Sequence, residues 1–277
     1  MTLPRTRAQL IADLHRLGLA PGDLVWVHAS VRSVGPVLGG PDEIHQAILD
    51  AVSPGGTMVM LIGASNGFDD VARGNLSAQE EAQILADMPP FDKQATRANR
   101  NNGTLAEFFR SWPGTVMSDS VAVRLGARGA RADWFVADHP NDWPFGKGTP
   151  FEKLVAANGK LLLLGSDPDQ VTLLHYAESI ADFPDKIVRN FTVPVMQGGE
   201  RIWLKCQEFD SSTGAHRNWS PRQFGEITEA FAARFAGTPA CARGKIGASD
   251  STLIATQPFM AFAVAMMEQI ARRLTAS

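Results

Sequence analysis

A histidine just beyond a predicted buried strand is the strongest candidate for chemistry in this chain. His175 follows the apolar run at 160–164 and the polar loop at 165–169, in the first turns of a predicted helix. A carboxylate can hold an imidazole there through one ring nitrogen, which leaves the other nitrogen to act as a general base. Asp169 is the first candidate for that carboxylate, and Glu178, one helical turn on, is the second. The alternative is a half-buried histidine that only bonds a neighbouring carbonyl.

The loop after the first predicted strand, residues 28–35, is the second candidate. Backbone N–H groups and the side chains of Ser30, Arg32 and Ser33 could hold an anion such as a pyrophosphate. The alternative is an ordinary strand–helix loop. Neither the GxxxxGK[ST] phosphate loop nor the GxGxxG dinucleotide fingerprint occurs in the chain.

Scattered carboxylates form the third group. Phe91-Asp92 and Glu208-Phe209-Asp210 place acidic and aromatic side chains together at the ends of predicted elements. This combination suits an amino sugar, because carboxylates bind ammonium groups and aromatic faces pack against sugar rings. Solvated surface charge is the alternative. The candidates are Asp69, Asp70, Asp92, Glu208, Asp210 and Glu226.

A covalent nucleophile and a metal site have little support. The GxSxG elbow of serine hydrolases is absent, so a hydrolase that pairs Ser30 with His175 is not indicated. Cys206 falls in a predicted strand, which disfavours a Cys–His pair. No CxxC motif or Cys/His cluster is present, and we therefore expect no metal.

Hydrophobic patterns place these residues on alternating helices and strands. Apolar runs at 24–27, 57–62 and 160–164 predict buried strands, and the first two flank a predicted helix, an order that implies parallel pairing. The other expected elements are a helix at 5–18, a helix at 42–52, a strand at 116–127, a hairpin at 187–205 that turns at 197–199, and helices at 76–87, 105–112, 149–158, 172–180 with Thr172 as cap, 220–235 and 257–274.

The expected fold is α/β, with a mostly parallel central sheet flanked by helices, an added antiparallel β-hairpin and an irregular acidic insertion at 63–102. A long irregular segment of this kind is often a functional lid, so we expect it to bind substrate within a single domain spanning 1–277. Sites in such sheets lie at the carboxyl ends of strands, which is where 28–35 and 165–175 are expected.

Composition limits the class of protein. The chain has 277 residues, 44% hydrophobic and 20% charged, with a net charge of −3 and no basic cluster, so it gives no reason to expect a nucleic-acid partner. It shows no secretory signal and no apolar stretch long enough for a membrane span. Its two cysteines fit a reduced cytoplasmic protein. The oligomeric state is left open.

Several motifs in order resemble the aminoglycoside 3-N-acetyltransferase family, which differs in fold from the common GNAT acetyltransferases. The resemblance covers nearly the whole chain. The matching segments are LGLAPGDLVWVHASVRSVGPVLGGPDEIHQAILDAVSPGGTMVM, GTLAEFFRSWPGTVMSD, HPNDWPFGKGTPFEKLVAANGKLLLLG, DPDQVTLLHYAE and EFDSSTG.

The resemblance implies a role for each matching position. The family's catalytic histidine corresponds to His175, its orienting aspartate to Asp169, and a later acidic residue completes the site, with Glu226 preferred over Glu208. The acidic insertion corresponds to the drug-binding region, which makes Asp69, Asp70 and Asp92 candidates there. The expected contacts of acetyl-CoA, the co-substrate, are His28, Ser30, Val31, Arg32, Ser33, Val34 and Gly35.

The chain departs from the family at one motif. Many members have Ser-x-His-Pro after the Trp-Pro-Gly turn, whereas this chain has Ser118-Asp119-Ser120-Val121, and His139-Pro140 comes later. The departure concerns the shape of the substrate pocket and so the choice of drug, rather than His175 or Asp169.

The expected reaction is direct acetyl transfer from acetyl-CoA to the 3-amino group of an aminoglycoside, which gives resistance to the antibiotic. His175 would remove the amine proton, and backbone N–H groups or a hydroxyl near Ser30 would stabilise the oxyanion. The alternatives are an acetyltransferase for a different amine metabolite and a non-catalytic protein that binds a cationic ligand.

Overall fold

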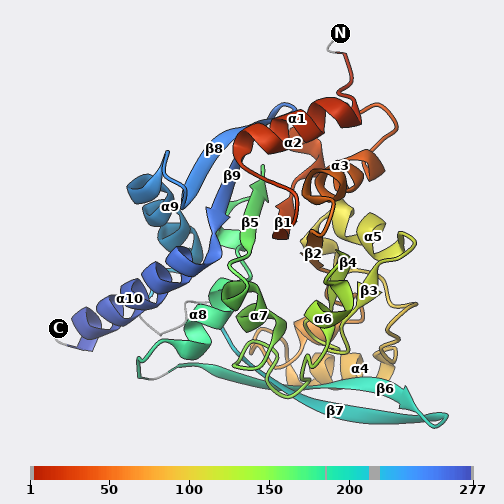
Figure 1. The fold of residues 1–277 in the computed structure, drawn as a ribbon. Coiled ribbons are helices and arrows are strands. Elements are labelled where there is room, and N and C mark those ends of the chain that lie inside the picture. The colour runs from red at the N-terminus through yellow and green to blue at the C-terminus, as the bar shows by residue number, and fades with distance from the viewer. Residues whose placement is uncertain (1–2, 185, 212–218, 276–277) are drawn as a thin grey trace.

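The fold is built on a seven-stranded mixed sheet, seen in a computed structural model that describes residues 3–184, 186–211 and 219–275 (Figure 1). The strand order is β3-β4-β2-β1-β5-β9-β8. The strands are β1 Leu24–Ala29, β2 Thr57–Leu61, β3 Val116–Met117, β4 Leu125–Gly129, β5 Lys160–Leu164, β8 Cys241–Ile246 and β9 Ser249–Ala255.

The centre of the sheet is parallel and its flanks are antiparallel. β1 pairs in parallel with β2 and β5, as the apolar runs predict, and the other four pairings are antiparallel. Because only β4 and β9 run against the rest, most strands point the same way, and the expected α/β architecture is confirmed.

Helices cover both faces of this sheet because side chains alternate along its buried strands. Val25 and Val27 face one apolar cluster with α1, α3 and α5, whereas Leu24 and Trp26 face a second cluster with α7 to α10. The α-helices are α1 Arg7–Leu17, α2 Val31–Val34, α3 Asp42–Val52, α4 Ala78–Asp87, α5 Thr104–Ser111, α6 Ala132–Val136, α7 Pro150–Ala156, α8 Leu174–Ile180, α9 Gln223–Phe235 and α10 Thr256–Thr275. Short 3₁₀ turns are η1 Phe68–Asp70, η2 Arg100–Asn102 and η3 Pro168–Gln170.

The predicted hairpin is present as a separate two-stranded sheet, β6 Val188–Gln197 and β7 Glu200–Phe209. It lies across one end of the molecule beside α4, which places it against the insertion (Figure 1). Arg201 on β7 donates to the backbone carbonyl of Met88 after α4, at 2.7 Å, which ties the two together.

Two predictions about the elements were wrong, and one pair of strands was not predicted. Residues 116–127 are not one strand, because the chain leaves β3 after Met117 and returns antiparallel as β4. Thr172 does not cap α8, whose N-cap is Leu173. The β8–β9 pair, with the sequences CARGKI and SDSTLIA, has no apolar run long enough to predict two strands.

No helix among the described residues combines the length and the apolar character needed to cross a bilayer.

Candidate active site

A cavity of about 930 Å³ opens at the carboxyl ends of β1, β2 and β5. The insertion supplies one side of its wall through η1 and η2, and the end of β7 and the start of α9 supply another. This is the edge of the sheet where the sequence predicts a site, since parallel strands end there together.

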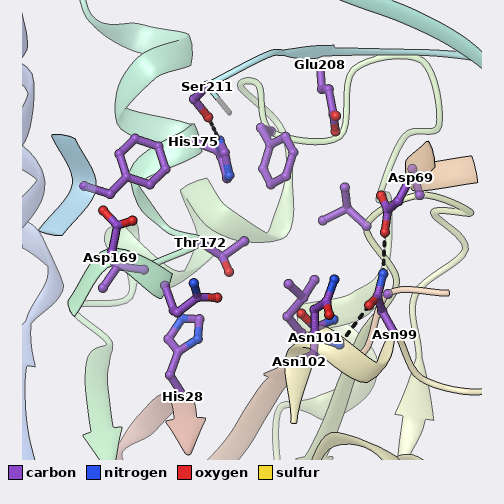
Figure 2. Close-up of a pocket in the computed structure, with 18 of the residues that line it drawn as sticks. His28, Asp69, Asn99, Asn101, Asn102, Asp169, Thr172, His175, Glu208 and Ser211 are labelled. Atoms are coloured by element: carbon purple, nitrogen blue, oxygen red, sulfur yellow. Dashed lines mark hydrogen bonds between the residues drawn. The ribbon is translucent and has the colours of Figure 1, made fainter. Parts of the chain in front are cut away.

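His175 stands in this cavity at the first turn of α8 (Figure 2). Its Nδ1–H donates to Glu178 Oε2 at 2.8 Å, and Ser211 Oγ lies 3.4 Å from the same nitrogen. The hydrogen on Nδ1 leaves a lone pair on Nε2, which has no protein hydrogen-bond partner in the described part of the chain. Phe145 and Phe224 pack against the ring, with centroid distances of 4.6 and 4.8 Å, and fix its orientation.

Glu178 is the carboxylate behind the histidine. Its side chain is fully buried, and burial raises the pKa of the Glu178 carboxyl, an effect that the hydrogen bond from His175 opposes. Gln223 Nε2, at the start of α9, donates to its other oxygen at 3.4 Å. A buried charge of this kind is costly, and such groups cluster at functional sites.

Asp169, the sequence's first choice for that carboxylate, has another partner. It lies in η3 and lines the cavity, but its Oδ1 accepts the backbone N–H of Gly225 at 2.7 Å. Figure 2 shows Asp169 apart from His175, to its lower left, with no bond between them. The carboxylate that bonds His175 in this structure is therefore Glu178, three residues further along the same helical face, and not Asp169.

Glu226 lies outside this cavity. It lies exposed on α9 and is not among the residues that line the cavity. The sequence placed it near His175 through family position alone, and helix rotation carries its side chain outward.

Thr172 takes a place in the site that the sequence did not assign to it. It precedes α8, lines the cavity and lies just below His175 in Figure 2. Its backbone carbonyl accepts the His175 N–H at 3.1 Å, so the two residues hold a fixed relation. The Thr172 hydroxyl is thus a hydrogen-bond donor in the wall of the same cavity.

His28, at the end of β1, also lines the cavity. Trp26 Nε1 donates to His28 Nε2 at 2.9 Å, and burial lowers the pKa of His28 to about 4. The ring is therefore neutral at physiological pH, with its hydrogen on Nδ1.

The rest of the predicted coenzyme loop, residues 30–35, does not border this cavity. Val31–Val34 is a short helix, and Ser33 Oγ bonds Ser30 O at 2.7 Å and Ser249 Oγ at 2.9 Å. Gly165 at the end of β5 is required by this packing, since a Cβ there would lie 2.0 Å from Ser33 Oγ. Coenzyme contact by Ser30, Val31, Arg32, Ser33, Val34 and Gly35 stays a prediction.

Four of the six predicted acidic residues line the cavity, whereas Asp92 and Glu226 do not. Asp69, Asp70, Glu208 and Asp210 border it, and Figure 2 shows Asp69 and Glu208 across the cavity from Asp169. Burial raises the pKa of Asp69. Asp92 instead lies outside, where it caps a turn by accepting the N–H groups of Gln94 and Ala95 at 2.8 and 2.6 Å.

Two arginines among these carboxylates were not foreseen. Arg189 on β6 is buried and bonds Glu208 Oε1 at 2.8 Å. Arg73, in the insertion, lines the cavity and lies between Asp69, Glu208 and Asp210. The hairpin register places Arg189 directly opposite Glu208, whereas Arg73 lies more than a hundred residues before Glu208 and Asp210, and no local sequence pattern pairs it with them.

The altered motif at 118–121 lies behind the cavity. Ser118 is buried, and its Oγ donates to His139 Nδ1 at 3.0 Å, while His139 Nε2 donates to the carbonyl of Pro144 at 3.0 Å. The two parts that are separate in the sequence, Ser118 and His139-Pro140, therefore meet in the fold. The cavity wall begins just beyond the motif, at Ala122 and Val123.

The matching segments around His175 extend into residues outside the described structure. In the segment EFDSSTG, Glu208 to Ser211 are described, whereas 212–214 lie outside the described residues. No group of three or more His, Cys, Asp or Glu side chains that could hold a metal ion occurs in the described ranges.

A sequence model of the aminoglycoside 3-N-acetyltransferase family matches residues 26–268. The chain belongs to this family. The resemblance that the motifs indicate is thus confirmed, together with the α/β fold.

Two curated family members show the extent of the similarity. Aminoglycoside N(3)-acetyltransferase III of Pseudomonas aeruginosa is 36% identical over 268 residues, which cover 97% of this chain and 95% of the relative. Aminoglycoside N(3)-acetyltransferase VII of Streptomyces paromomycinus is 37% identical, with 96% and 92% covered.

Solved structures of the family share this fold. AAC-IIIb in a binary complex with CoASH has a TM-score of 0.88 and 39% identity, over 97% of this chain and 98% of that one. AAC-VIa bound to sisomicin has a TM-score of 0.87 and 28% identity, over 97% and 99%. The acetyltransferase family thus includes proteins that bind the coenzyme and proteins that bind a drug.

Proposed function

We propose that this protein transfers the acetyl group of acetyl-CoA to the 3-amino group of an aminoglycoside antibiotic, and so confers resistance to it. The observation that carries the proposal is His175, backed by the buried Glu178 and open at Nε2 to a cavity walled by carboxylates. Membership of the acetyltransferase family supports the reaction and the class of substrate.

His175 is the proposed general base. An aminoglycoside amine is largely an ammonium ion at neutral pH, and only the free amine can attack a thioester. His175 Nε2 accepts the proton, and the Glu178 carboxylate on Nδ1 stabilises the imidazolium that results. Glu178 therefore takes the orienting role that the sequence assigned to Asp169.

The proposed transfer exchanges the carbon–sulfur bond of the thioester for a carbon–nitrogen bond. A bond forms between the amine nitrogen and the acetyl carbon, and the bond from that carbon to sulfur breaks. The ammonium nitrogen loses two protons in becoming the amide: His175 passes one to the departing thiolate, and the other is released to solvent. The Thr172 hydroxyl, on the same side of the cavity, is placed to donate to the acetyl oxygen as negative charge develops on it.

The proposed role of Asp169 is structural support for the base. By accepting the Gly225 N–H it anchors the first turn of α9. That turn carries Phe224 against the His175 ring and Gln223 against Glu178. Glu226, exposed on the same helix, has no part in the proposal.

A bound coenzyme would supply a partner for one buried acceptor of the cavity wall. Gln223 Oε1 is buried without a hydrogen-bond partner, and Gln223 lines the cavity wall. An acceptor in this position suits the amide N–H groups of a pantetheine arm. We propose that Gln223 holds that arm and that His28 with residues 30–35 lies along the coenzyme's path, while acetyl-CoA supplies the activated acetyl group.

The drug is proposed to bind on the opposite wall. Asp69, Asp70, Glu208 and Asp210 offer carboxylates for its ammonium groups. We therefore treat 63–102 as a substrate-binding insertion within one domain spanning 1–277. The reaction is placed in the cytoplasm, an assignment supported by the free, buried Cys206 and Cys241.

The direct test is a mass measurement of several aminoglycosides after incubation with acetyl-CoA and the protein, with the position of any acetyl group located by fragmentation. We expect one added acetyl group on the 3-amino nitrogen. Acetylation at another nitrogen would support the acetyltransferase activity but refute the assignment of the 3-amino group. If no aminoglycoside were acetylated and acetyl-CoA were consumed only with a different amine, the proposed substrate class would be refuted.

A further inference from the structure

We infer that Arg73 is an internal cation that occupies the ammonium-binding position of the cavity, and that a cationic substrate must displace it. Arg73 would thereby set the affinity for the drug without taking part in the reaction. The inference rests on the proposed function, because it assumes that the substrate is a polyamine.

Arg73 lies among three carboxylates of the cavity wall. Its guanidinium nitrogens are 3.3 Å from Asp210, 3.5 Å from Glu208 and 3.9 Å from Asp69. Charge-assisted hydrogen bonds are shorter, about 2.7–2.9 Å, so none of the three contacts is a tight pair. The guanidinium is shared among the carboxylates and fixed by none of them.

Arg189, which also contacts Glu208, is held much more firmly than Arg73. Its side chain is 1% exposed, it bonds Glu208 at 2.8 Å, and it donates to the backbone carbonyls of Phe68 and Val71. It cannot leave without freeing buried carbonyls, which is costly. Arg189 thus belongs to the framework and holds the segment that carries Arg73.

Arg73 has a much smaller anchor. Its side chain is 26% exposed, and beyond the carboxylates its bond is from Nε to the carbonyl of Asp69, at 2.7 Å. It lines an open cavity, so the side chain has room to swing toward solvent. Water can then satisfy both the guanidinium and that carbonyl.

Charge balance explains why the position should exchange. Arg73 contributes one positive charge beside three carboxylates, of which Glu208 is also paired with Arg189. A substrate ammonium that replaces Arg73 restores the same balance. A ligand with several ammonium groups also reaches Asp70 on the same wall, which Arg73 does not contact in the structure. Polyamines should therefore displace Arg73 more readily than monoamines do.

The test is calorimetric titration of sisomicin into the free enzyme and into R73Q, without coenzyme. Loss of two or three partly exposed ion pairs should tighten the dissociation constant of sisomicin about fivefold to tenfold, since each such pair contributes little by itself. KM for sisomicin should fall in step with little change in kcat, and KM for acetyl-CoA should not change.

Two variants control for charge and for folding. R100Q removes the same charge from an exposed side chain in η2, beside the cavity-lining Asn101 and Asn102, and should change affinity less than about twofold. R73K keeps a cation and should stay near the wild type. If R73Q does not fold, R73M, which keeps the length and the apolar stem, takes its place.

The outcomes separate this inference from the proposed function. Unchanged or weaker sisomicin binding in R73Q, in a wild type that does acetylate aminoglycosides, would overturn the inference alone. A raised KM for acetyl-CoA in R73Q with unchanged drug binding would assign Arg73 to the coenzyme and also overturn it. A wild type that acetylates no aminoglycoside would instead remove the proposed function.

Discussion

At the scale of single residues, the reactivity of His175 depends on what lies on each side of its ring. Nδ1 is held by a buried carboxylate, two phenylalanines press on the ring faces and edges, and Nε2 meets the cavity. A neutral imidazole with one fixed tautomer needs no reorganisation before it accepts a proton.

Replacement of His175 by alanine tests the base. We expect H175A to bind acetyl-CoA and drug with affinities close to those of the wild type and to lose about a hundredfold or more in kcat. Single-turnover kinetics with both substrates saturating would measure this loss. Turnover near the wild-type value would exclude His175 as the base.

Replacement of Glu178 by glutamine separates catalysis from folding. The amide keeps the shape but not the charge, so E178Q should lose about tenfold or more in kcat with little change in KM. Because Glu178 is fully buried and the charged form is disfavoured there, the same change should leave the free energy of unfolding unchanged or raise it.

Kinetics and urea unfolding of the same E178Q sample provide the two measurements. A loss of stability that parallels the loss of turnover would mean that Glu178 acts as a packing residue. Matched assays of D169N, where the partner is a backbone N–H, would report the effect of the α9 anchor for comparison.

At the scale of elements, the insertion at 63–102 brings its charged residues to two different places. The η1 turn faces the cavity with Asp69 and Asp70, whereas the segment that begins at Asp92 closes on itself through a capped turn. Hydrogen bonds decide this split, because Asp92 has its own backbone partners and Asp69 is held by Asn99 from the far end of the insertion.

Neutralising these carboxylates one at a time tests that division. D69N and D70N should raise KM for a cationic drug about threefold to tenfold, with a larger effect at low salt because screening weakens the attraction. D92N is the matched control, since asparagine can also accept from the two N–H groups, and its KM should not change.

Steady-state kinetics at two ionic strengths would measure all three variants. An increase in KM for D92N as large as that for D69N would show a general effect of net charge. Unchanged KM in both D69N and D70N would place the drug on another wall.

At the scale of the whole molecule, buried neutral histidines connect stability to pH. His139 is 4% exposed, its ring bonds the Ser118 hydroxyl just after β3 and the Pro144 carbonyl, and burial lowers its pKa to about 4. An unfolded chain has a histidine pKa near 6.5, so the unfolded state binds the proton first as the pH falls. Stability should therefore decrease from about pH 6.5 down to about pH 4 and then level off.

The variant H139Q tests this link. One histidine with this shift should cost about 2 kcal/mol in the free energy of unfolding between pH 7.5 and pH 5. H139Q should be less stable than the wild type at pH 7.5, and its stability should fall less steeply toward pH 5. Urea unfolding at several pH values would give both slopes, and parallel curves would remove His139 from the acid response. The pKa of His28 is also lowered to about 4, so His28 should retain part of the dependence of stability on pH in H139Q.

The sequence by itself determined the local structure and the family. Apolar runs located β1, β2 and β5, whose parallel pairing brings His28 and the 165–175 segment to one edge. These signals are local or depend on sheet topology, and so they survive without coordinates. The motifs around His175 also predicted the family, which the comparison with known sequences confirms.

Only the tertiary structure decided which side chains meet. Asp169 and Glu178 were both possible partners for His175, and the direction of η3 toward α9 turned Asp169 to Gly225. Arg73 contacts Glu208 and Asp210 across more than a hundred residues of chain, and Ser118 contacts His139 across 21 residues. Side-chain direction depends on how elements pack, and packing between distant segments leaves no periodic trace in the sequence.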